Sequence, residues 1–321
     1  MQGRVVVVGS ANLDLVTVTP TLPLPGETLL ALSYAELPGG KGSNQATAAA
    51  RLGAQVSFVG RRGADAAGDR LRSALADEGV DVQHFGLAEG PTGRALVMVD
   101  EAAENSIIVV QGTNALVTPA TVAEAAALLA AAQVVVCQLE VPVDAVLAAA
   151  RATAGSFVLN PAPAQRLPAE LLSAVDVLVV NETEYETVLG SPLPDDLADL
   201  ATVAARPGMP ATIVATLGAR GAALCHGGTV TVLAPPKVTV VDTTGAGDTF
   251  VGALAAELAA GLELPQAVRH AVTAASLSTR TLGATQGMPR RDEVMAVAPQ
   301  SPEPVTSPPR GFQQAGTPAE A

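Results

Sequence analysis

Large aromatic side chains and basic residues are scarce in this sequence. Trp is absent, and aromatic residues make up 2% of the 321 positions. Lys and Arg number 18 against 31 Asp and Glu, so the formal net charge is -13. Proteins that bind nucleic acids stack bases on aromatic rings and neutralise phosphates with clustered Lys and Arg. We therefore expect neither nucleic acid nor an anionic membrane as a partner. An anionic small molecule would have to be held by backbone amides, helix N-termini or a divalent cation.

Cysteines and long apolar runs are also few. The two cysteines, Cys137 and Cys225, lie in apolar stretches, and we expect them to be small buried hydrophobic residues in strands. The longest Ala/Leu-rich run, residues 125–132, is too short for a bilayer, which needs about 20 apolar residues. The N-terminal MQGRVVVVGSANLD has only a short apolar run before polar residues, which predicts a first strand and no signal peptide. These features predict a cytoplasmic protein.

Val- and Ile-rich runs alternate with Ala/Leu-rich segments along most of the chain, and 49% of residues are hydrophobic. This alternation predicts an α/β fold in three layers, with a central, mostly parallel sheet and helices on both faces. The expected strands are Val5–Val8, Val56–Val59, Val134–Leu139, Phe157–Asn160, Val177–Val180, Ile213–Thr216 and Ala222–His226. The expected helices are Ser43–Leu52, Asp69–Glu78, Pro119–Ala131, Val143–Ala152, Ala169–Leu172, Glu182–Leu189, Ala246–Ala260 and Leu264–Thr279.

Polar residues end several of these strands, where open α/β sheets bind their ligands. They are Ser10, Gln138, Asn160, Asn181 and Thr216. Residues 15–36 and 92–110 are predicted to be extended and to form a small β-sheet lid; the alternative is two edge hairpins packed on the core. We expect one domain over residues 1–297, followed by a Pro-rich, disordered tail over residues 298–321.

The strongest chemical signal is VVDTTGAGDTFVGALAAEL, residues 240–258. Gly245, Ala246 and Gly247 allow a tight turn into a long helix whose first amides stay free, which predicts an anion hole. Asp248 lies in the same first turn, where a carboxylate can take a proton from an attacking hydroxyl. Taken alone, the alternative that Asp248 only caps the helix is about equally good.

This segment resembles the C-terminal signature of the ribokinase family of carbohydrate kinases, which also includes fructokinase and adenosine kinase. The resemblance continues in VVVVGSANLDLV, PLPGET, LPGGKGSNQATAAARLGA, LNPAPA and VVNETE, and ends near residue 292. Several motifs in the same order make a chance agreement very improbable. The resemblance implies a ribokinase-like fold and a kinase that transfers the γ-phosphoryl group of ATP to a sugar.

By resemblance, one set of residues contacts the sugar. Their short polar side chains suit hydroxyls that donate and accept in fixed directions. They are Asn12, Asp14, Gly40, Lys41, Asn44 and Glu140, with Asp248 as the base. Taken alone, Gly39-Gly40 is either an ordinary loop or a hinge between lid and core, and Glu140 is a solvated strand end.

The nucleotide site is also implied by the resemblance. Asn181 is expected near the phosphates and Glu184 is expected to orient water around Mg²⁺, although alone this segment is a helix N-cap. The TLGARG loop is otherwise a plain turn; its residues expected at ATP are Thr216, Gly218 and Gly221, together with Gly247. Ribokinases commonly have Asn or His where this sequence has Val272, so we expect adenine contacts there to be apolar or to come from elsewhere.

The family is activated by a monovalent cation, and a loop of carbonyls with a carboxylate suits K⁺. The matching positions are Asp242, Thr244, Ser278, Thr281, Gly283 and Gly287. The histidines His84, His226 and His270 show no metal-ligand spacing and are interpreted as structural.

The sequence therefore predicts phosphorylation of D-ribose to D-ribose 5-phosphate, within ribose catabolism, with ATP, Mg²⁺ and K⁺ as cofactors. One alternative is a kinase for another pentose, a hexose or a nucleoside, although few aromatics disfavour a nucleoside slot. Another is a catalytically silent sugar-binding protein, which the intact base and glycines disfavour. Exposed lid edges also suggest a homodimer.

Overall fold

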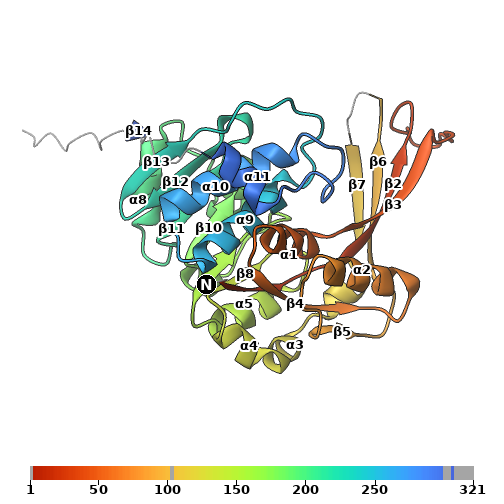
Figure 1. Ribbon diagram of the computed structural model, residues 1–321, viewed down its shortest axis with the longest axis horizontal. Helices are drawn as coiled ribbons and strands as arrows, with labels where there is room; N and C mark the ends of the chain where they lie inside the picture. The colour runs from red at the N-terminus through yellow and green to blue at the C-terminus, as the bar shows by residue number, and fades with distance from the viewer. Residues whose placement is uncertain (1–2, 102–104, 299–304, 307–321) are drawn as a thin grey trace, which may run out of the picture.

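The computed structural model describes residues 3–101, 105–298 and 305–306 (Figure 1). Within these ranges, ten strands form one sheet in the order β14-β13-β12-β11-β10-β9-β8-β1-β4-β5. The strands from β11 to β5 in this order are parallel, and β12, β13 and β14 continue the sheet antiparallel. Their bounds are β1 Arg4–Val8, β4 Gln55–Arg62, β5 Phe85–Leu87, β8 Val134–Cys137, β9 Ser156–Leu159, β10 Val177–Val180, β11 Thr212–Thr216, β12 Ala222–His226, β13 Thr229–Leu233 and β14 Val305–Thr306.

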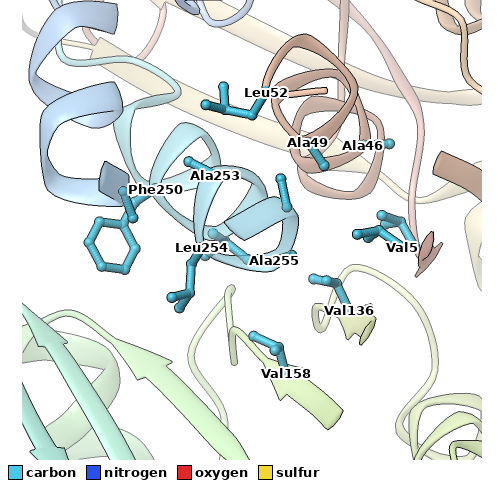
Figure 2. Close-up of a cluster of buried hydrophobic side chains, with 14 of the residues drawn as sticks. Val5, Ala46, Ala49, Leu52, Val136, Val158, Phe250, Ala253, Leu254 and Ala255 are labelled. Atoms are coloured by element: carbon cyan, nitrogen blue, oxygen red, sulfur yellow. The ribbon is translucent and has the colours of Figure 1, made fainter. Parts of the chain in front are cut away.

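Helices cover both faces of this sheet. Alternate residues of β1 face opposite layers, with Val5 and Val7 in one buried cluster and Val6 and Val8 in the other. Figure 2 shows the first layer, in which Ala and Leu side chains of α1 and α9 lie over Val136 and Val158. The helices are α1 Lys41–Arg51, α2 Ala66–Asp77, α3 Pro119–Glu124, α4 Ala126–Ala130, α5 Val143–Ala152, α6 Ala169–Ser173, α7 Glu182–Leu189, α8 Leu200–Ala204, α9 Ala246–Ala259, α10 Leu264–Ser278 and α11 Arg291–Val297.

A second, smaller sheet stands apart from the first and has the order β3-β2-β6-β7 (Figure 1). We call it the lid sheet; its strands are β2 Asn12–Val18, β3 Ser33–Gly39, β6 Gly93–Val99 and β7 Asn105–Val110. Three residues separate the end of β1 from the start of β2, and a single residue, Gly40, separates β3 from α1. The lid sheet is therefore joined to the core at the carboxyl edge of the main sheet.

The predicted fold class is confirmed: a mostly parallel sheet, two helical layers and a small second sheet. The predicted helix over 119–131 is interrupted, because Ala125 leaves helical geometry between α3 and α4. The strand β13 was not predicted, although Gly227 and Gly228 have positive φ and form the hairpin turn that leads into it. Residues 299–304 and 307–321 of the predicted tail lie outside the described residues.

Among the described helices, none is long and apolar enough to cross a bilayer. Both cysteines are fully buried in strands, as expected for small hydrophobic residues.

Candidate active site

Helix α9 begins at a turn that only glycine fits. Gly245 is the N-cap, with a φ of 75° in the left-handed region. A Cβ at this position would lie 2.4 Å from the carbonyl oxygen of Ala284, so the loop after α10 packs directly on the turn. An L-residue here would be strained by the backbone conformation and would also clash.

The turn leaves two backbone amides free. Ala246 N donates to Thr243 O at 3.2 Å, and Thr249 N donates to Gly245 O at 2.8 Å. Between them, the N–H groups of Gly247 and Asp248 have no acceptor among the described residues. They stand at the positive end of the helix dipole, which carries a partial charge of about +0.5. The predicted anion hole therefore has its donors in place at the start of α9.

Two side-chain amides of α1 hold the carboxylate of Asp248, which is 7% exposed. Asn44 Nδ2 donates to Oδ2 and Gln45 Nε2 donates to Oδ1, each at 3.0 Å. Helix α1 reaches α9 because Gly252 has no side chain: a Cβ there would lie 2.4 Å from Gln45 O. The carboxylate therefore points toward α1 and the site. In a helix-capping role it would instead turn back onto the first turn of α9.

A cavity of about 140 Å³ lies in front of this turn. Residues predicted to bind the sugar, to bind the nucleotide with its Mg²⁺ and to carry out catalysis all line this cavity. They are Lys41 for the sugar, Asn181, Glu184, Thr216 and Gly247 for the nucleotide and its Mg²⁺, and Gly245 and Asp248 for catalysis. Gly218 and Gly221 do not line this cavity; they are in the turn between β11 and β12. Val272 is 4% exposed and belongs to the buried core, so it does not line this cavity either.

The predicted sugar residues gather at the hinge between the lid sheet and the core. Glu140 is 9% exposed, and its Oε2 accepts from Ser10 Oγ at 2.5 Å and from Lys41 N at 3.0 Å. The isolated interpretation of Glu140 as a solvated strand end is wrong. Gly40 has a φ of 90°, and a Cβ on it would lie 2.7 Å from Asn12 N. These contacts fix the short segment through which lid and core are joined.

Two buried acceptor atoms in this region have no donor among the described residues: Asp14 Oδ1 and Asn44 Oδ1. Burial, followed by the charges of Glu140 and Asp248, raises the pKa of Asp14 to about 7. The charge of Asp248 raises the pKa of Lys41 and outweighs the opposing effect of burial. Unpaired buried acceptors cost free energy unless a ligand supplies donors. A polyol, whose hydroxyls are donors, matches this demand.

On the nucleotide side, Asn181 and Glu184 form a reciprocal capping box at the start of α7. Glu184 N donates to Asn181 Oδ1 at 2.8 Å, and Asn181 N donates to Glu184 Oε2 at 2.9 Å. Both residues cap the helix and also line the cavity, so the two interpretations of this motif are compatible. Burial raises the pKa of Glu184. A single carboxylate fits a Mg²⁺ ion that is held mainly by phosphates and water.

The six predicted cation ligands lie in two neighbouring groups beside Gly245. Asp242 accepts from Thr244 N at 2.9 Å and from Gly283 N at 2.7 Å. Burial disfavours its charge, but the bonds from Gly283 and Thr244 outweigh it and lower the pKa of Asp242. In the second group, a Cβ on Gly287 would lie 2.1 Å from Ser278 O and 3.3 Å from the Cβ of Thr281. An ionised carboxylate near a loop of carbonyls fits a monovalent cation.

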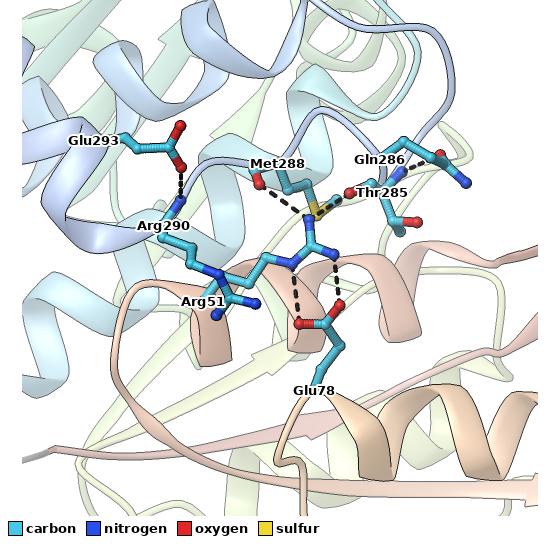
Figure 3. A network of polar contacts seen from close by, with 7 residues as sticks. All are labelled: Arg51, Glu78, Thr285, Gln286, Met288, Arg290 and Glu293. Atoms are coloured by element: carbon cyan, nitrogen blue, oxygen red, sulfur yellow. Dashed lines mark hydrogen bonds and ion pairs between the residues drawn. The ribbon is translucent and has the colours of Figure 1, made fainter.

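Arg51 ties this loop to the end of α1 (Figure 3). Its Nη1 donates to Thr285 O at 2.6 Å and to Met288 O at 3.0 Å, while its Nε and Nη2 bind the carboxylate of Glu78. Arg51 therefore anchors the loop that packs on Gly245 to the end of α1 and, through Glu78, to the end of α2.

Three polar residues around the site were not predicted as site residues. Gln45 holds Asp248, and Asn114 Nδ2 donates to Asn12 Oδ1 at 2.7 Å, which turns the Asn12 amide. Ser10 was recognised only as a strand end, and it binds Glu140. Gln45 follows Lys41 by four positions in α1, a spacing that puts both on one face; the predicted helix began at Ser43 and left Lys41 out. No comparable signal marks Asn114.

Free amides at a helix N-terminus, a buried carboxylate beside them and a lysine in one cavity are the features of a phosphoryl-transfer site. The sequence model of the family described as pfkB family carbohydrate kinase matches residues 2–291. The ribokinase of Haemophilus influenzae is 38% identical over 301 residues, which cover 92% of this chain and 98% of that protein.

Solved structures of related kinases have the same fold as this chain. The Arabidopsis thaliana ribokinase complexed with ribose and ATP has a TM-score of 0.86 and 34% identity, over 94% of this chain and 100% of that one. Escherichia coli phosphofructokinase-2 in complex with potassium has a TM-score of 0.76 and 26% identity, over 92% and 98%. This chain belongs to the pfkB family of carbohydrate kinases, and it is a ribokinase-like phosphotransferase that uses ATP.

Proposed function

We propose that the protein phosphorylates D-ribose to D-ribose 5-phosphate, with Asp248 as general base. The observation that carries this proposal is the meeting of Asp248, the free amides of Gly247 and Asp248, and the unpaired acceptors Asp14 Oδ1 and Asn44 Oδ1 at one place. Acceptors that await hydroxyl donors suit a small sugar.

In the proposed mechanism, Asp14, Asn44, Lys41 and Glu140 hold the sugar between lid sheet and core. Asp248 takes the proton of the attacking hydroxyl, and the two free amides stabilise negative charge that develops on the transferring phosphoryl group. Mg²⁺, when bound with ATP, neutralises phosphate charge, and Glu184 would hold it through water. K⁺ beside Asp242 would add positive field behind the anion hole.

A panel assay of ADP release with pentoses, hexoses and nucleosides, with and without K⁺, tests the substrate. We expect ribose to give the highest kcat/KM. A preference of ten-fold or more, a difference of about 1.4 kcal/mol, for another sugar or for a nucleoside would replace ribose by that alternative.

Asp248→Asn keeps the size of the side chain and removes the base. We expect kcat to fall by roughly 10²–10⁴-fold, while ribose still raises the melting temperature, because the sugar clamp is intact. A variant that retains the wild-type kcat would refute the assigned role.

We also propose that two copies associate through their lid sheets. The lid sheet exposes large apolar residues, among them Tyr34 at 58%, Ile107 at 53% and Val109 at 44%. Exposed apolar patches on a sheet with free edges favour pairing with a second chain. Sedimentation analysis should show a dimer in the wild type and a monomer when Ile107 and Val109 are replaced by Lys; a wild-type monomer would refute this assembly.

A further inference from the structure

Behind Asp248, three buried side chains form a chain of amide hydrogen bonds. Gln138 Nε2 donates to Gln45 Oε1 at 2.6 Å, and Gln45 Nε2 donates both to Asp248 Oδ1 at 3.0 Å and to Asn160 Oδ1 at 3.1 Å. Gln45 and Gln138 are fully buried and Asn160 is 8% exposed. The members come from α1 and from the ends of β8 and β9, so three elements converge behind one carboxylate.

The direction of every bond in this chain is set at one end. Asn160 Nδ2 donates to Val179 O at 3.1 Å, and a backbone carbonyl can only accept. Asn160 must therefore present Oδ1 to Gln45, and Gln45 must present Nε2 to Asn160 and to Asp248. The Gln45 amide is turned so that it can only donate to the base.

We propose that Gln45 is a positioning residue for the base: it orients the carboxylate of Asp248 and keeps it in the proton-accepting form. A donor on Oδ1 stabilises the ionised carboxylate, and it cannot accept a proton that Asp248 would carry. Oδ1 accepts from Gln45 and Oδ2 accepts from Asn44, so the two amides of α1 together hold the carboxylate in one orientation toward the site. Gln138 acts one step further back, by holding the Gln45 amide. This inference rests on the proposed role of Asp248.

Four other charged groups act in this neighbourhood. Lys41 of α1 lies near enough to Asp248 to interact with it electrostatically, and its charge assists the ionised form. Asp14 of β2 and Glu184 of α7 oppose it, and Glu140 interacts with Asp14 and Lys41. Because Asp14 and Glu184 interact unfavourably with the charge of Asp248, the amide donors Gln45 on Oδ1 and Asn44 on Oδ2 act together with Lys41 in holding this carboxylate.

The test replaces Gln45 by Met, which keeps the length and removes the donor. We expect kcat to fall roughly ten- to a hundred-fold, the loss that matches one hydrogen bond to a charged group. Ribose KM should change little. The acidic limb of the kcat–pH profile should move to higher pH, because the ionised base has lost a donor.

Two further variants separate positioning from general damage. Gln138→Met keeps Gln45 but releases its amide, and should shift the same limb in the same direction by less. Thr47→Val, a substitution of equal size at a buried position of the same helix, should leave kcat and the profile unchanged. All variants are first compared with the wild type by melting temperature.

An unshifted limb with a wild-type kcat in Gln45→Met overturns the inference, and so does a loss confined to the KM for ribose. A second measurement needs no substrate. In protein labelled with ¹³C at aspartate carboxyl groups, the chemical shift of the Asp248 carboxyl signal should change in Gln45→Met and should stay as in the wild type in Thr47→Val, because only the first variant removes a donor from Oδ1. If the wild type phosphorylated no sugar, the proposed function would fail, yet this chemical shift would still support or refute the role of Gln45.

Discussion

Asp14 should make the stability of the protein depend on pH near neutrality. Its ordinary pKa of 3.8 is raised to about 7 in the folded protein, first by burial and then by Glu140 and Asp248. The folded state therefore holds a proton that the unfolded state has lost. The stabilisation by protonated Asp14 is fully present below the pKa of Asp14 in the unfolded chain. It is lost as the pH rises through the pKa of Asp14 in the folded protein.

The magnitude follows from the difference of about 3 pKa units. At 1.36 kcal/mol per unit, the full effect is about 4 kcal/mol, and about 2–3 kcal/mol of it falls between pH 5 and pH 8. Asp14→Asn has no charge to bury and should lack this part of the pH dependence.

The assay is urea denaturation of both proteins at the two pH values. The free energy of unfolding should fall between pH 5 and pH 8 by about 2–3 kcal/mol more in the wild type than in Asp14→Asn. Other titrating groups change both proteins alike and cancel in the comparison. Parallel pH profiles of the two proteins would refute the burial of an acidic Asp14, and with it the demand for a donor from the sugar.

Two more predictions have matched controls. Gly245→Ala should lower stability by about 1–3 kcal/mol and reduce kcat, because of the φ of 75° and the carbonyl of Ala284. Gly190→Ala, at the same φ but with nothing within 4 Å, should keep kcat in the same assay; equal loss in both would refute the packing argument. Arg51→Met should lower the free energy of unfolding in urea by about 2–3 kcal/mol, because its partners at Thr285, Met288 and Glu78 are mostly covered. Arg151→Met, whose ion pair with Glu170 is 61% exposed on both sides, should cost less than about 0.5 kcal/mol; similar costs would contradict the anchoring of this loop.

The sequence indicates those parts of the site that are built locally. The glycines before Asp248 imply a helix start with free amides, and polar residues at strand ends, such as Gln138 and Asn160, mark the carboxyl edge of the sheet. The hold of Gln45 on Asp248 was not predictable in this way. It depends on the close approach of α1 and α9 at Gly252, between residues that are 203 positions apart. The interruption of the predicted helix at Ala125 has no local marker either, since its neighbours are good helix formers.

The cavity that is proposed to bind ATP is lined by acidic residues, which repel the phosphates of the nucleotide. Glu184 and Asp248 both line it, and Lys41 is the one basic residue among its lining residues in the described part of the chain. Two free amides and one ammonium group leave most of the charge of ATP uncompensated beside these carboxylates. We therefore expect a divalent cation to enter with the nucleotide: EDTA should abolish turnover and weaken ATP binding, while ribose should still raise the melting temperature. Glu184→Gln should increase the Mg²⁺ concentration needed for half-maximal activity, whereas Glu182→Gln, at a neighbouring exposed position of α7, should not. Equal Mg²⁺ requirements in the two variants would show that the phosphates alone hold the ion and that Glu184 serves only the helix cap.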